Sequence, residues 1–377
     1  MGTLDGVRVV EMAGLGPVPF AAMMLADMGA DVVRIDSPVR NPEDPHDRTG
    51  PIWRGRSGIS LDLKDPLDLS RAKELLESAD VVLEGYRPGV MERLGLSPSE
   101  LIAANPRLIV GRMTGWGQDG PLAREAGHDI NYLAMSGILR QIGREGERPL
   151  PPLNLVGDYG GGGMLLTVGV LAALVERATS KRGQVVDAAM IDGAALLMVS
   201  VMGWIAKGTW QEPPGTNAID TGSPFYEVYR TADNRDLAVG AVEPRFYERL
   251  LEVLGLDPTL LAHQYDRASW PATKKMFADT VSQRTLTEWT EAFDTADACV
   301  SPVLTIREAY SHPHFDARGT WTSFGDAIQP AAAPRFSRTP SVTAEMSSGE
   351  SLESVVERWS TPRLAVTEDL TTSRPIR

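Results

Sequence analysis

His128 and Asp158 are the residues of this sequence whose types and surroundings best suit proton transfer. A proline-rich stretch at 149–152 lies between them and can return the chain towards the segment that it left. A neutral histidine could then remove a proton on one side of a substrate while a protonated aspartate supplies one on the other. Taken alone, the same two residues also fit a buried structural histidine and a helix-capping aspartate. The pair therefore predicts acid–base catalysis only together with further signals.

A run of glycines at 160–163 follows Asp158 and leads into an apolar stretch at 164–175 that predicts a helix. Glycine lets a ligand or another backbone come close. The first N–H groups of a helix have no partner within the helix, so they can face a negatively charged oxygen. We expect the backbone at Gly157 and Tyr159, or the glycines that follow, to stabilise an oxyanion.

The composition is that of an ordinary globular protein, with 42% hydrophobic and 23% charged residues. A length of 377 residues predicts about two domains. A formal net charge of −13 argues against binding to nucleic acids, whose phosphates require a basic surface. A small polyanion could still bind where basic residues gather. Several do so in the N-terminal third of the chain: Arg54, Arg56, Lys64, Arg87, Arg93, Arg107 and Arg112.

The single cysteine, Cys299, excludes internal disulfides and cysteine-based metal clusters. The histidines are scattered except for His312 and His314, whose spacing is not that of a metal site. The chain opens without the pattern of a signal peptide, and its most apolar windows, 164–175 and 188–205, are interpreted as buried helices because they are too short and too interrupted to span a membrane. We therefore expect a cytoplasmic protein with no structural metal, no bound cofactor, and neither a membrane nor a nucleic acid as partner.

Short β-branched runs at 7–12 and 30–36 predict two strands, and the apolar periodicity at 20–28 predicts the helix that joins them. Such a unit is typical of a parallel sheet. Asp36 ends the second strand, but the third glycine of a dinucleotide fingerprint is missing, so an NAD site is disfavoured. Ligands of open α/β sheets bind at the carboxyl ends of the strands, which several of the basic residues follow. Further strands are expected at 59–63, 79–84 and 108–113, with a helix at 67–78.

The stretch 207–224 is rich in glycine, proline, threonine and aspartate and is typical of a linker. Two strands at 225–229 and 237–242 predict a hairpin around Asp233. The stretch 312–334 has the composition of a loop. Proline-rich segments on both sides of one small α+β region predict that the chain leaves a larger domain and returns to it. The helices of this region are expected at 245–254, 273–281 and 286–293.

A series of short motifs resembles those of the family III CoA-transferases. They follow one another in the same order and cover nearly the whole chain. Within the family, the resemblance is strongest to the branch that inverts the carbon next to a CoA thioester. The motifs are VVEMAG at 9–14, DVVRID at 31–36, EGYRPGVMERLG at 84–95, TGWGQ at 114–118, GHDINY at 127–132, PPLNLVGD at 151–158, GQVVDAAM at 183–190, AVGAVEP at 238–244 and PRFSRT at 334–339.

The resemblance implies an α/β fold, with a Rossmann-like large domain joined by linkers to a small α+β domain. It also implies an interlocked homodimer, in which each active site lies between the large domain of one chain and the small domain of the other. The expected divisions are a large domain at 1–205, a linker at 206–224, the small domain at 225–310, and a return linker with a C-terminal segment that packs on the large domain at 311–377.

The resemblance also implies roles for single residues. His128 and Asp158 are expected to be the two catalytic bases, with Asp129 and Glu243 supporting the histidine. A carboxylate can hold an imidazole in one tautomer, and Glu243 is the expected partner. Arg93 matches a contact to a CoA phosphate. The segments expected to line the CoA site contribute Leu61, Lys64, Gly85, Tyr86 and Arg87.

Ser37 departs from the family pattern, because its position usually carries an arginine in close relatives. The resemblance therefore does not carry the CoA contact of that arginine over to Ser37. We expect Arg40, Arg54 or Arg56 to supply it instead.

The activity that the resemblance implies is the interconversion of (2R)- and (2S)-2-methylacyl-CoA thioesters, by two-base proton transfer through an enolate, in fatty acid metabolism. The runner-up is CoA transfer, in which Asp129 would be the nucleophile that forms an acyl anhydride. The presence of both His128 and Asp158 favours the racemase, because transferases usually lack this pair. A non-catalytic acyl-CoA-binding protein is the third alternative, which a turnover assay would exclude. The sequence leaves the acyl group open.

Overall fold

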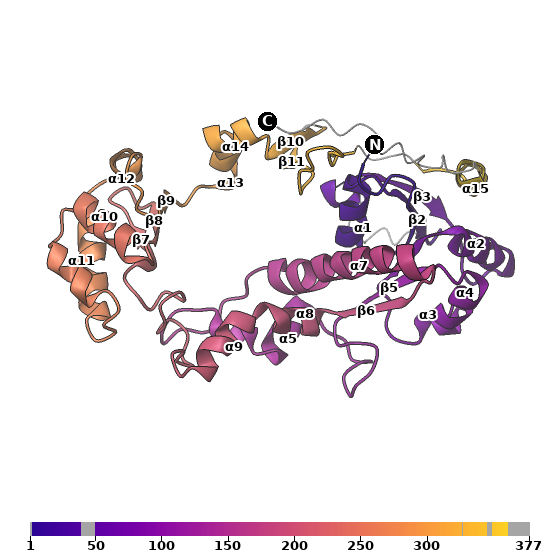
Figure 1. Cartoon of the computed structure of the whole chain (residues 1–377), viewed down its shortest axis with the longest axis horizontal. Coiled ribbons are helices and arrows are strands. Elements are labelled where there is room, and N and C mark those ends of the chain that lie inside the picture. The colour runs from indigo at the N-terminus through magenta and orange to yellow at the C-terminus, as the bar shows by residue number, and fades with distance from the viewer. Residues whose placement is uncertain (1, 39–49, 326, 345–348, 361–377) are drawn as a thin grey trace. The chain divides into compact units, whose positions relative to one another are not determined.

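Two compact units make up the structure, a computed structural model that describes residues 2–38, 50–325, 327–344 and 349–360 (Figure 1). The first unit contains Met1–Arg124, Gly163–Ala188 and Ala331–Arg377, and the second contains Glu125–Gly162 and Ala189–Pro330. Each unit therefore combines segments that are far apart in the sequence. The domain bounds expected from the sequence stay a prediction.

A six-stranded sheet forms the centre of the first unit, in the order β3-β2-β1-β4-β5-β6. The strand pairs β3–β2, β2–β1, β1–β4 and β4–β5 are all parallel. This confirms the expected α/β fold with a parallel sheet. The order reverses between β1 and β4, and open α/β sheets bind ligands at such a switch point. The strands are β1 (Arg8–Met12), β2 (Asp31–Asp36), β3 (Arg56–Ser60), β4 (Val81–Glu84), β5 (Ile109–Thr114) and β6 (Val185–Ala189).

Several helices of the first unit, among them α1, α2 and α4, begin with a proline. The carboxylate of Asp65 accepts hydrogen bonds from the N–H groups of Leu67 and Asp68, and Pro66 takes the first helical position. The helices are α1 (Pro17–Asp27), a 3₁₀ turn at Pro51–Trp53, α2 (Pro66–Ser78), α3 (Val90–Arg93), α4 (Pro98–Ala104), α7 (Leu165–Ser180) and α15 (Leu352–Ser360).

The long helix α7 lies directly on β5, because Gly111 of that strand has no side chain. A Cβ atom at Gly111 would come within 2.9 Å of Leu166 and 3.3 Å of Val170, and both of these helix residues are fully buried. Near the C-terminus, Trp359 of α15 belongs to the core of the same unit and donates its indole N–H to Asp31 at 2.7 Å. The first unit is thus held together by packing between distant parts of the chain.

In the second unit β7 (Tyr226–Arg230) and β8 (Asp236–Gly240) pair as an antiparallel hairpin, which confirms the sequence prediction, and β9 (Val300–Pro302) pairs with β8. The sheet packs on an aromatic core, where the Phe225 ring lies 6.0 Å from Tyr247 and 5.9 Å from Trp270. The other elements are α5 (Asp129–Met135), α6 (Ile138–Gln141), a π-helical segment (Leu155–Met164), α8 (Met190–Leu197), α9 (Val199–Ala206), α10 (Pro244–Leu254), a 3₁₀ helix (Pro258–His263), α11 (Trp270–Val281), α12 (Leu286–Phe293), α13 (Ile306–Tyr310), α14 (Pro313–Arg318), β10 (Trp321–Phe324) and β11 (Ala327–Pro330).

Three local expectations differ from the structure. The strand expected at 59–63 begins earlier, as β3, because its pairing partner β2 sets its register. The apolar window 188–205 forms two helices rather than one, with a break at Met198. The stretch 312–334 is not a loop throughout, since α14 and the hairpin of β10 with β11 lie within it. Composition alone does not predict these short elements. Proline and glycine are frequent in loops, but they also begin and end helices, as they do in α14.

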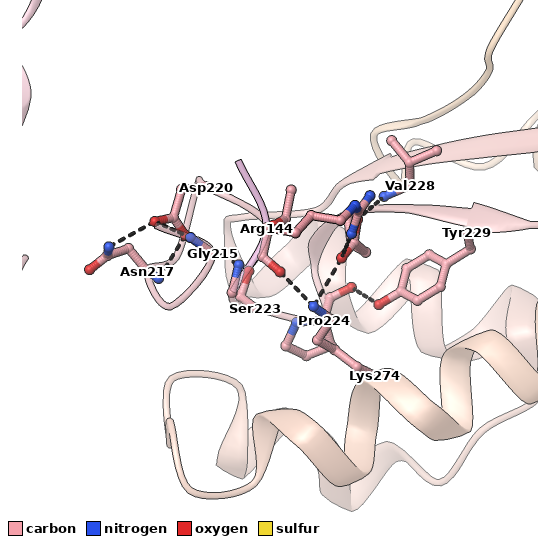
Figure 2. A network of polar contacts seen from close by, with 12 residues as sticks. Arg144, Gly215, Asn217, Asp220, Ser223, Pro224, Val228, Tyr229 and Lys274 are labelled. Atoms are coloured by element: carbon pink, nitrogen blue, oxygen red, sulfur yellow. Dashed lines mark hydrogen bonds and ion pairs between the residues drawn. The ribbon is translucent and has the colours of Figure 1, made fainter. Parts of the chain in front are cut away.

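The glycine- and proline-rich stretch 207–224 is a folded loop (Figure 2). The carboxylate of Asp220 accepts backbone N–H groups of Gly215 at 3.0 Å, Asn217 at 2.7 Å and Gly222 at 3.2 Å. The side-chain amide of Asn217 donates to the same carboxylate at 2.8 Å. One aspartate therefore organises the loop that leads into β7.

One helical stretch among the described residues, Leu155–Ser180, is long and apolar enough to cross a membrane by length and composition alone. The sequence predicts no such span, because its apolar window at 164–175 is too short to cross a bilayer. The stretch contains Asp158 and the glycine run, and its second half is α7, which packs on β5. These are contacts of a core helix in a globular unit.

Candidate active site

His128 lies in the second unit, at the residue before α5. Its backbone N–H donates to the side-chain oxygen of Asn131 at 3.0 Å, and the hydroxyl of Tyr132 donates to the carbonyl of Gly127 at 2.5 Å. These two bonds hold the turn from which the imidazole projects. The histidine itself is exposed, so its ring is accessible to a substrate.

Asp129 and Asp158 are joined directly. The carboxylate of Asp129 is 9% exposed and accepts the backbone N–H of Asp158 at 2.7 Å. A Cβ atom at Gly157 would lie 2.3 Å from Oδ1 of Asp129, so a side chain at this position would displace the carboxylate. The hydrogen bond between Asp129 and the backbone of Asp158 therefore requires a glycine at position 157.

The side chain of Asp158 is half-buried, and burial raises the pKa of its carboxyl above the ordinary value. The negative charge of Asp129 raises this pKa further. A hydrogen bond of 3.5 Å from the amide of Asn154 and the charge of a protonated His128 act in the opposite direction without cancelling the rise. Asp158 thus holds its proton to a higher pH than a free aspartate, and it senses the charge of His128. A proton-donating carboxyl next to an imidazole is the arrangement that two-base catalysis requires.

The expected oxyanion donors are only partly available. The N–H of Asp158 is donated to Asp129, and the N–H of Tyr159 is donated to the carbonyl of Asn154 at 3.3 Å. The second of these bonds belongs to the π-helical segment that precedes α7, and the first joins that segment to Asp129. Stabilisation of an oxyanion by the backbone of Gly157 stays a prediction.

Glu243, the expected partner of His128, precedes α10 and is exposed. Glu243 lies near Cys299, the residue before β9. Burial raises the pKa of the Cys299 thiol, and the charges of Asp297 and Glu243 raise it further. No hydrogen bond between Glu243 and His128 is found within the described part of the chain. The role of Glu243 as the partner of the histidine stays a prediction.

A cavity of about 510 Å³ opens in the first unit at the carboxyl ends of β4 and β5. Arg87 and Arg93, both expected to contact CoA, lie together in its wall. Arg112 also lines it, but its guanidinium donates to Glu84 at 2.6 Å and to Glu92 at 2.9 Å. The full lining is Arg87, Pro88, Gly89, Glu92, Arg93, Arg112, Gln118, Ala123 and Arg124.

The arginines proposed to compensate for Ser37 have other contacts. Arg54 makes a two-point ion pair with buried Asp27, at 2.9 and 2.6 Å. Arg56 donates to fully buried Glu11 at 2.5 Å and lies 5.1 Å from the Trp53 ring. These buried pairs give both arginines a structural part in the first unit and disfavour a role in binding CoA. Arg40 lies outside the described residues, and Ser37 is exposed.

The remaining expected CoA-lining residues lie on the carboxyl side of β3 and β4. Leu61 is buried, whereas Lys64 and Gly85 are exposed. Tyr86 donates its backbone N–H to Glu84 at 2.7 Å, so a fully buried carboxylate holds the loop that carries Arg87. Among the described residues no cluster of three His, Cys, Asp or Glu side chains is arranged to bind a metal ion.

Sequence reasoning missed three residues that the structure brings to these sites. Asn154 donates to Asp158, and Gln118 and Arg124 line the cavity. Gln118 belongs to a recognised motif, but nothing local shows that its side chain faces a cavity. Arg124 was not predicted, because it lies beyond the basic residues of the N-terminal third, and Glu125 next to it in the sequence gives no local excess of positive charge.

Comparisons with known proteins show the family to which the chain belongs. A model of CoA-transferase family III matches residues 4–347. The chain is 47% identical to alpha-methylacyl-CoA racemase of Mus musculus over 90% of this chain and 88% of the relative, and 44% identical to the Homo sapiens enzyme of the same name over 94% and 93%. It is 30% identical to acetyl-CoA:oxalate CoA-transferase of Acetobacter aceti over 89% of this chain and 90% of the relative.

Solved structures show the same fold. A CAIB/BAIF family protein from Brucella suis superposes with a TM-score of 0.79 at 23% identity, over 95% of this chain and 99% of that one. A hypothetical protein from Mycobacterium tuberculosis gives a TM-score of 0.79 at 25% identity, over 94% and 99%. By the extent of the family match and the identity to its curated members, the chain belongs to CoA-transferase family III.

Proposed function

We propose that the protein is a racemase of 2-methylacyl-CoA thioesters. The observation that carries the proposal is the hydrogen bond by which Asp129, the residue after His128, holds the backbone of Asp158, whose carboxyl has a raised pKa because of burial and the charge of Asp129. The two racemases at 47% and 44% identity support the same activity. Thioesters of CoA with a methyl group next to the carbonyl are the substrate class that these names suggest, and we propose a place in fatty acid metabolism.

In the proposed reaction, one base removes the proton from the carbon next to the thioester, and the conjugate acid of the other base returns a proton to the opposite face. The two groups must begin with one proton between them. The raised pKa of Asp158 allows the state with neutral His128 and protonated Asp158, and proton transfer through the enolate reverses the assignment. The CoA moiety is part of the substrate, so this chemistry needs no further cofactor.

The geometry of Asp129 disfavours CoA transfer. A nucleophilic carboxylate must reach the thioester carbonyl, but the Asp129 carboxylate is 9% exposed and accepts the N–H of Asp158. In the proposed racemase Asp129 acts through Asp158 and remains unmodified. A covalent acyl adduct on Asp129 would favour the transferase.

We also propose a homodimer. None of the residues of α9 is buried, and exposed apolar side chains continue from α8 into it. Contiguous apolar surface of this kind marks interaction sites. The exposed residues, with their exposed fractions, are Leu196 (60%), Leu197 (55%), Val199 (67%), Met202 (57%) and Ile205 (47%).

Sedimentation of a charged variant tests the dimer. Met202→Asp places a charge on this surface and should reduce the dimer fraction, whereas Val356→Asp on α15, another exposed apolar position at 45%, should leave it unchanged. A wild-type protein that is monomeric at micromolar concentration would contradict the proposal.

The racemase is tested by NMR of one pure 2-methylacyl-CoA enantiomer incubated with the enzyme in heavy water. Deuterium should replace the proton next to the thioester and both enantiomers should appear, with no acceptor acid added. The opposite result, no exchange but CoA transfer to an added carboxylic acid, would establish the transferase instead.

A further inference from the structure

We propose that Gln264 and Tyr265 are positioning residues for Glu243, because they hold the backbone from which its carboxylate projects. The inference rests on the proposed function and on the expected role of Glu243 as the partner of the catalytic histidine. Neither Gln264 nor Tyr265 lies in one of the sequence motifs that resemble the family. Both residues directly follow the 3₁₀ helix Pro258–His263 of the second unit.

The carboxylate of Glu243 has no partner of its own among the residues that the structure describes. Glu243 is exposed and occupies the N-cap position of α10, but its side chain makes no capping hydrogen bond. The backbone after it is fixed, because its carbonyl accepts the N–H groups of Phe246 and Tyr247, each at 3.0 Å. The chain therefore holds the backbone of Glu243 and leaves its charge available to another residue.

Two neighbouring side chains, here called the clamp, hold the segment before Glu243. Nε2 of Gln264 donates to the carbonyl of Val242 at 2.7 Å and to that of Ala241 at 3.2 Å. The hydroxyl of Tyr265 donates to the same Val242 carbonyl at 2.7 Å. Both donors thus meet on the peptide group that joins Val242 to Glu243, so the clamp acts on the bond next to the exposed glutamate.

The side chain of Gln264 is only half satisfied. The residue is 2% exposed, and its Oε1 is buried without a hydrogen-bond partner in the described part of the chain. The amide cannot turn over to satisfy this oxygen, because the oxygen would then face two carbonyl oxygens. An apolar side chain of similar size would avoid the unpaired acceptor, which is unfavourable to bury. The two bonds of Nε2, which hold the segment before Glu243, are the physical reason for a glutamine here.

The clamp is anchored in the aromatic core of the second unit. Trp270, which is 5% exposed, donates its indole N–H to the backbone carbonyl of Gln264 at 2.9 Å. The Tyr265 ring packs edge-on against fully buried Phe225, with 5.7 Å between the ring centroids. A displacement of about 1 Å can lower the rate of an enzyme about 10²-fold. Because both clamp residues are fixed by the core, they can hold Glu243 within such limits.

A double-mutant cycle tests whether the clamp acts through Glu243. The measured quantity is the exchange of the proton next to the thioester, for each 2-methylacyl-CoA enantiomer in heavy water. Glu243→Gln should lower the maximal exchange rate. Tyr265→Phe removes only a hydroxyl from a residue that is 56% exposed, so this variant should fold normally and lose several-fold in the maximal rate. Gln264→Met should lose about tenfold or more, and KM should stay nearly unchanged in both.

In the Glu243→Gln background, both clamp substitutions should lose most of their effect, because the carboxylate that they position is absent. A merely structural role would leave their effects the same in both backgrounds. That result would overturn the inference, and so would a Glu243→Gln variant that keeps the wild-type rate.

Tyr229→Phe is the matched control. It also removes a tyrosine hydroxyl that donates to a backbone carbonyl, that of Pro224, at 2.6 Å. Tyr229 is 4% exposed, so the variant should have a lower melting temperature. At a temperature where it is folded, its exchange rate should equal that of the wild type. Rates that simply follow the melting temperature in Tyr229→Phe and in both clamp variants would contradict a positioning role.

Amide hydrogen exchange separates this inference from the proposed function, since it needs no turnover. The N–H of Gly240 donates to the carbonyl of Cys299 at 2.8 Å, and the N–H of Val242 donates to that of Gly240 at 2.9 Å. In Gln264→Met, peptides that cover residues 240–244 should exchange several-fold faster than in the wild type, whereas Glu243→Gln should leave them unchanged.

If the amides respond in this way while neither enantiomer loses its proton to heavy water, the racemase proposal fails and the clamp stands. If the enantiomers exchange but the amides of residues 240–244 are equally protected in Gln264→Met and the wild type, the clamp is overturned and the racemase stands.

Discussion

The carboxylate of Asp129 accepts a hydrogen bond of 2.7 Å from the backbone N–H of Asp158. The contact joins the first residue of α5 to the π-helical segment and brings the negative charge of Asp129 close enough to disfavour ionisation of Asp158. Asp129 is therefore both an anchor for the backbone of Asp158 and one cause of the raised pKa of its carboxyl. Because Asp129 has both effects, substitutions at Asp129 can change the pKa of Asp158 with or without the loss of the hydrogen bond.

The first prediction concerns Asp129→Asn. The asparagine oxygen can still accept the N–H of Asp158, but the negative charge is gone, so the pKa of Asp158 should fall towards its ordinary value. Asp158 acts as a base when deprotonated. The rising limb of the pH profile for deuterium exchange of the enantiomer that it deprotonates should move to lower pH.

Asp129→Ala is the comparison, because it removes the acceptor as well as the charge. It should lower the exchange rate at every pH in addition to moving the limb. A pH profile that is unchanged in Asp129→Asn would show that Asp129 does not tune Asp158.

The second prediction assigns the two bases. His128→Ala should reduce exchange from one enantiomer far more than from the other, and Asp158→Ala should show the reverse preference. Loss of a general base costs about 10² to 10⁴ in rate. Inversion of either enantiomer should fall in both variants, since each turnover uses both groups. Equal losses for both enantiomers in both variants would argue for a single-base mechanism.

The third prediction concerns Gly157→Ala. The new methyl group would meet the Asp129 carboxylate at 2.3 Å, so the π-helical turn or the carboxylate must shift. Overpacking of this kind costs about 1–3 kcal/mol of unfolding free energy. We expect a lower melting temperature and a large loss of exchange activity.

Gly50→Ala is the matched control for this change. Its φ is −78° and no atom lies within 4 Å of the added methyl group, so the melting temperature should stay the same or rise slightly. Equal melting temperatures for Gly157→Ala and the wild type would contradict the close contact with Asp129.

The fourth prediction concerns the stability of the second unit. Glu227 is 6% exposed, and its carboxylate accepts Arg144 at 2.8 Å and Lys274 at 2.9 Å in the polar network that Figure 2 shows. Burial acts to raise the pKa of Glu227, but the hydrogen bonds from Arg144, Lys274 and its neighbour Val228 hold it below the ordinary value. A depressed pKa stabilises the folded state above the unfolded pKa of about 4.3, and this stability is lost as the pH falls through the folded value.

Glu227→Gln should therefore unfold more easily than the wild type at pH 7, by about 1–3 kcal/mol for the lost charge-assisted bonds. The difference should shrink as the pH falls below about 4, because the wild-type carboxyl then becomes neutral as well. Denaturant unfolding at both pH values measures it. The exposed pair Arg249–Glu252 is the control, and Glu252→Gln should change little at either pH.

The amino-acid sequence by itself determined many of the local elements and indicated the two candidate bases. Alternating and β-branched runs predicted β1, β2 and the hairpin of β7 and β8, because these elements depend on neighbouring residues. The motif around His128 and the distant Asp158 indicated the chemistry through the residue types alone. Even the strand register of β3, however, depended on its partner strand and was predicted too late in the chain.

Only the tertiary structure decided how charged residues pair. Arg54 and Arg93 have the same side chain, yet Arg54 lies buried against Asp27 while Arg93 lines an open cavity. The role of Asp129 likewise became visible only when its oxygen met the N–H of Asp158 and the bare backbone of Gly157. Burial and the charge of a distant neighbour determine whether an ionisable side chain holds the fold together or faces a substrate, and both arise from contacts between segments that are far apart in the chain.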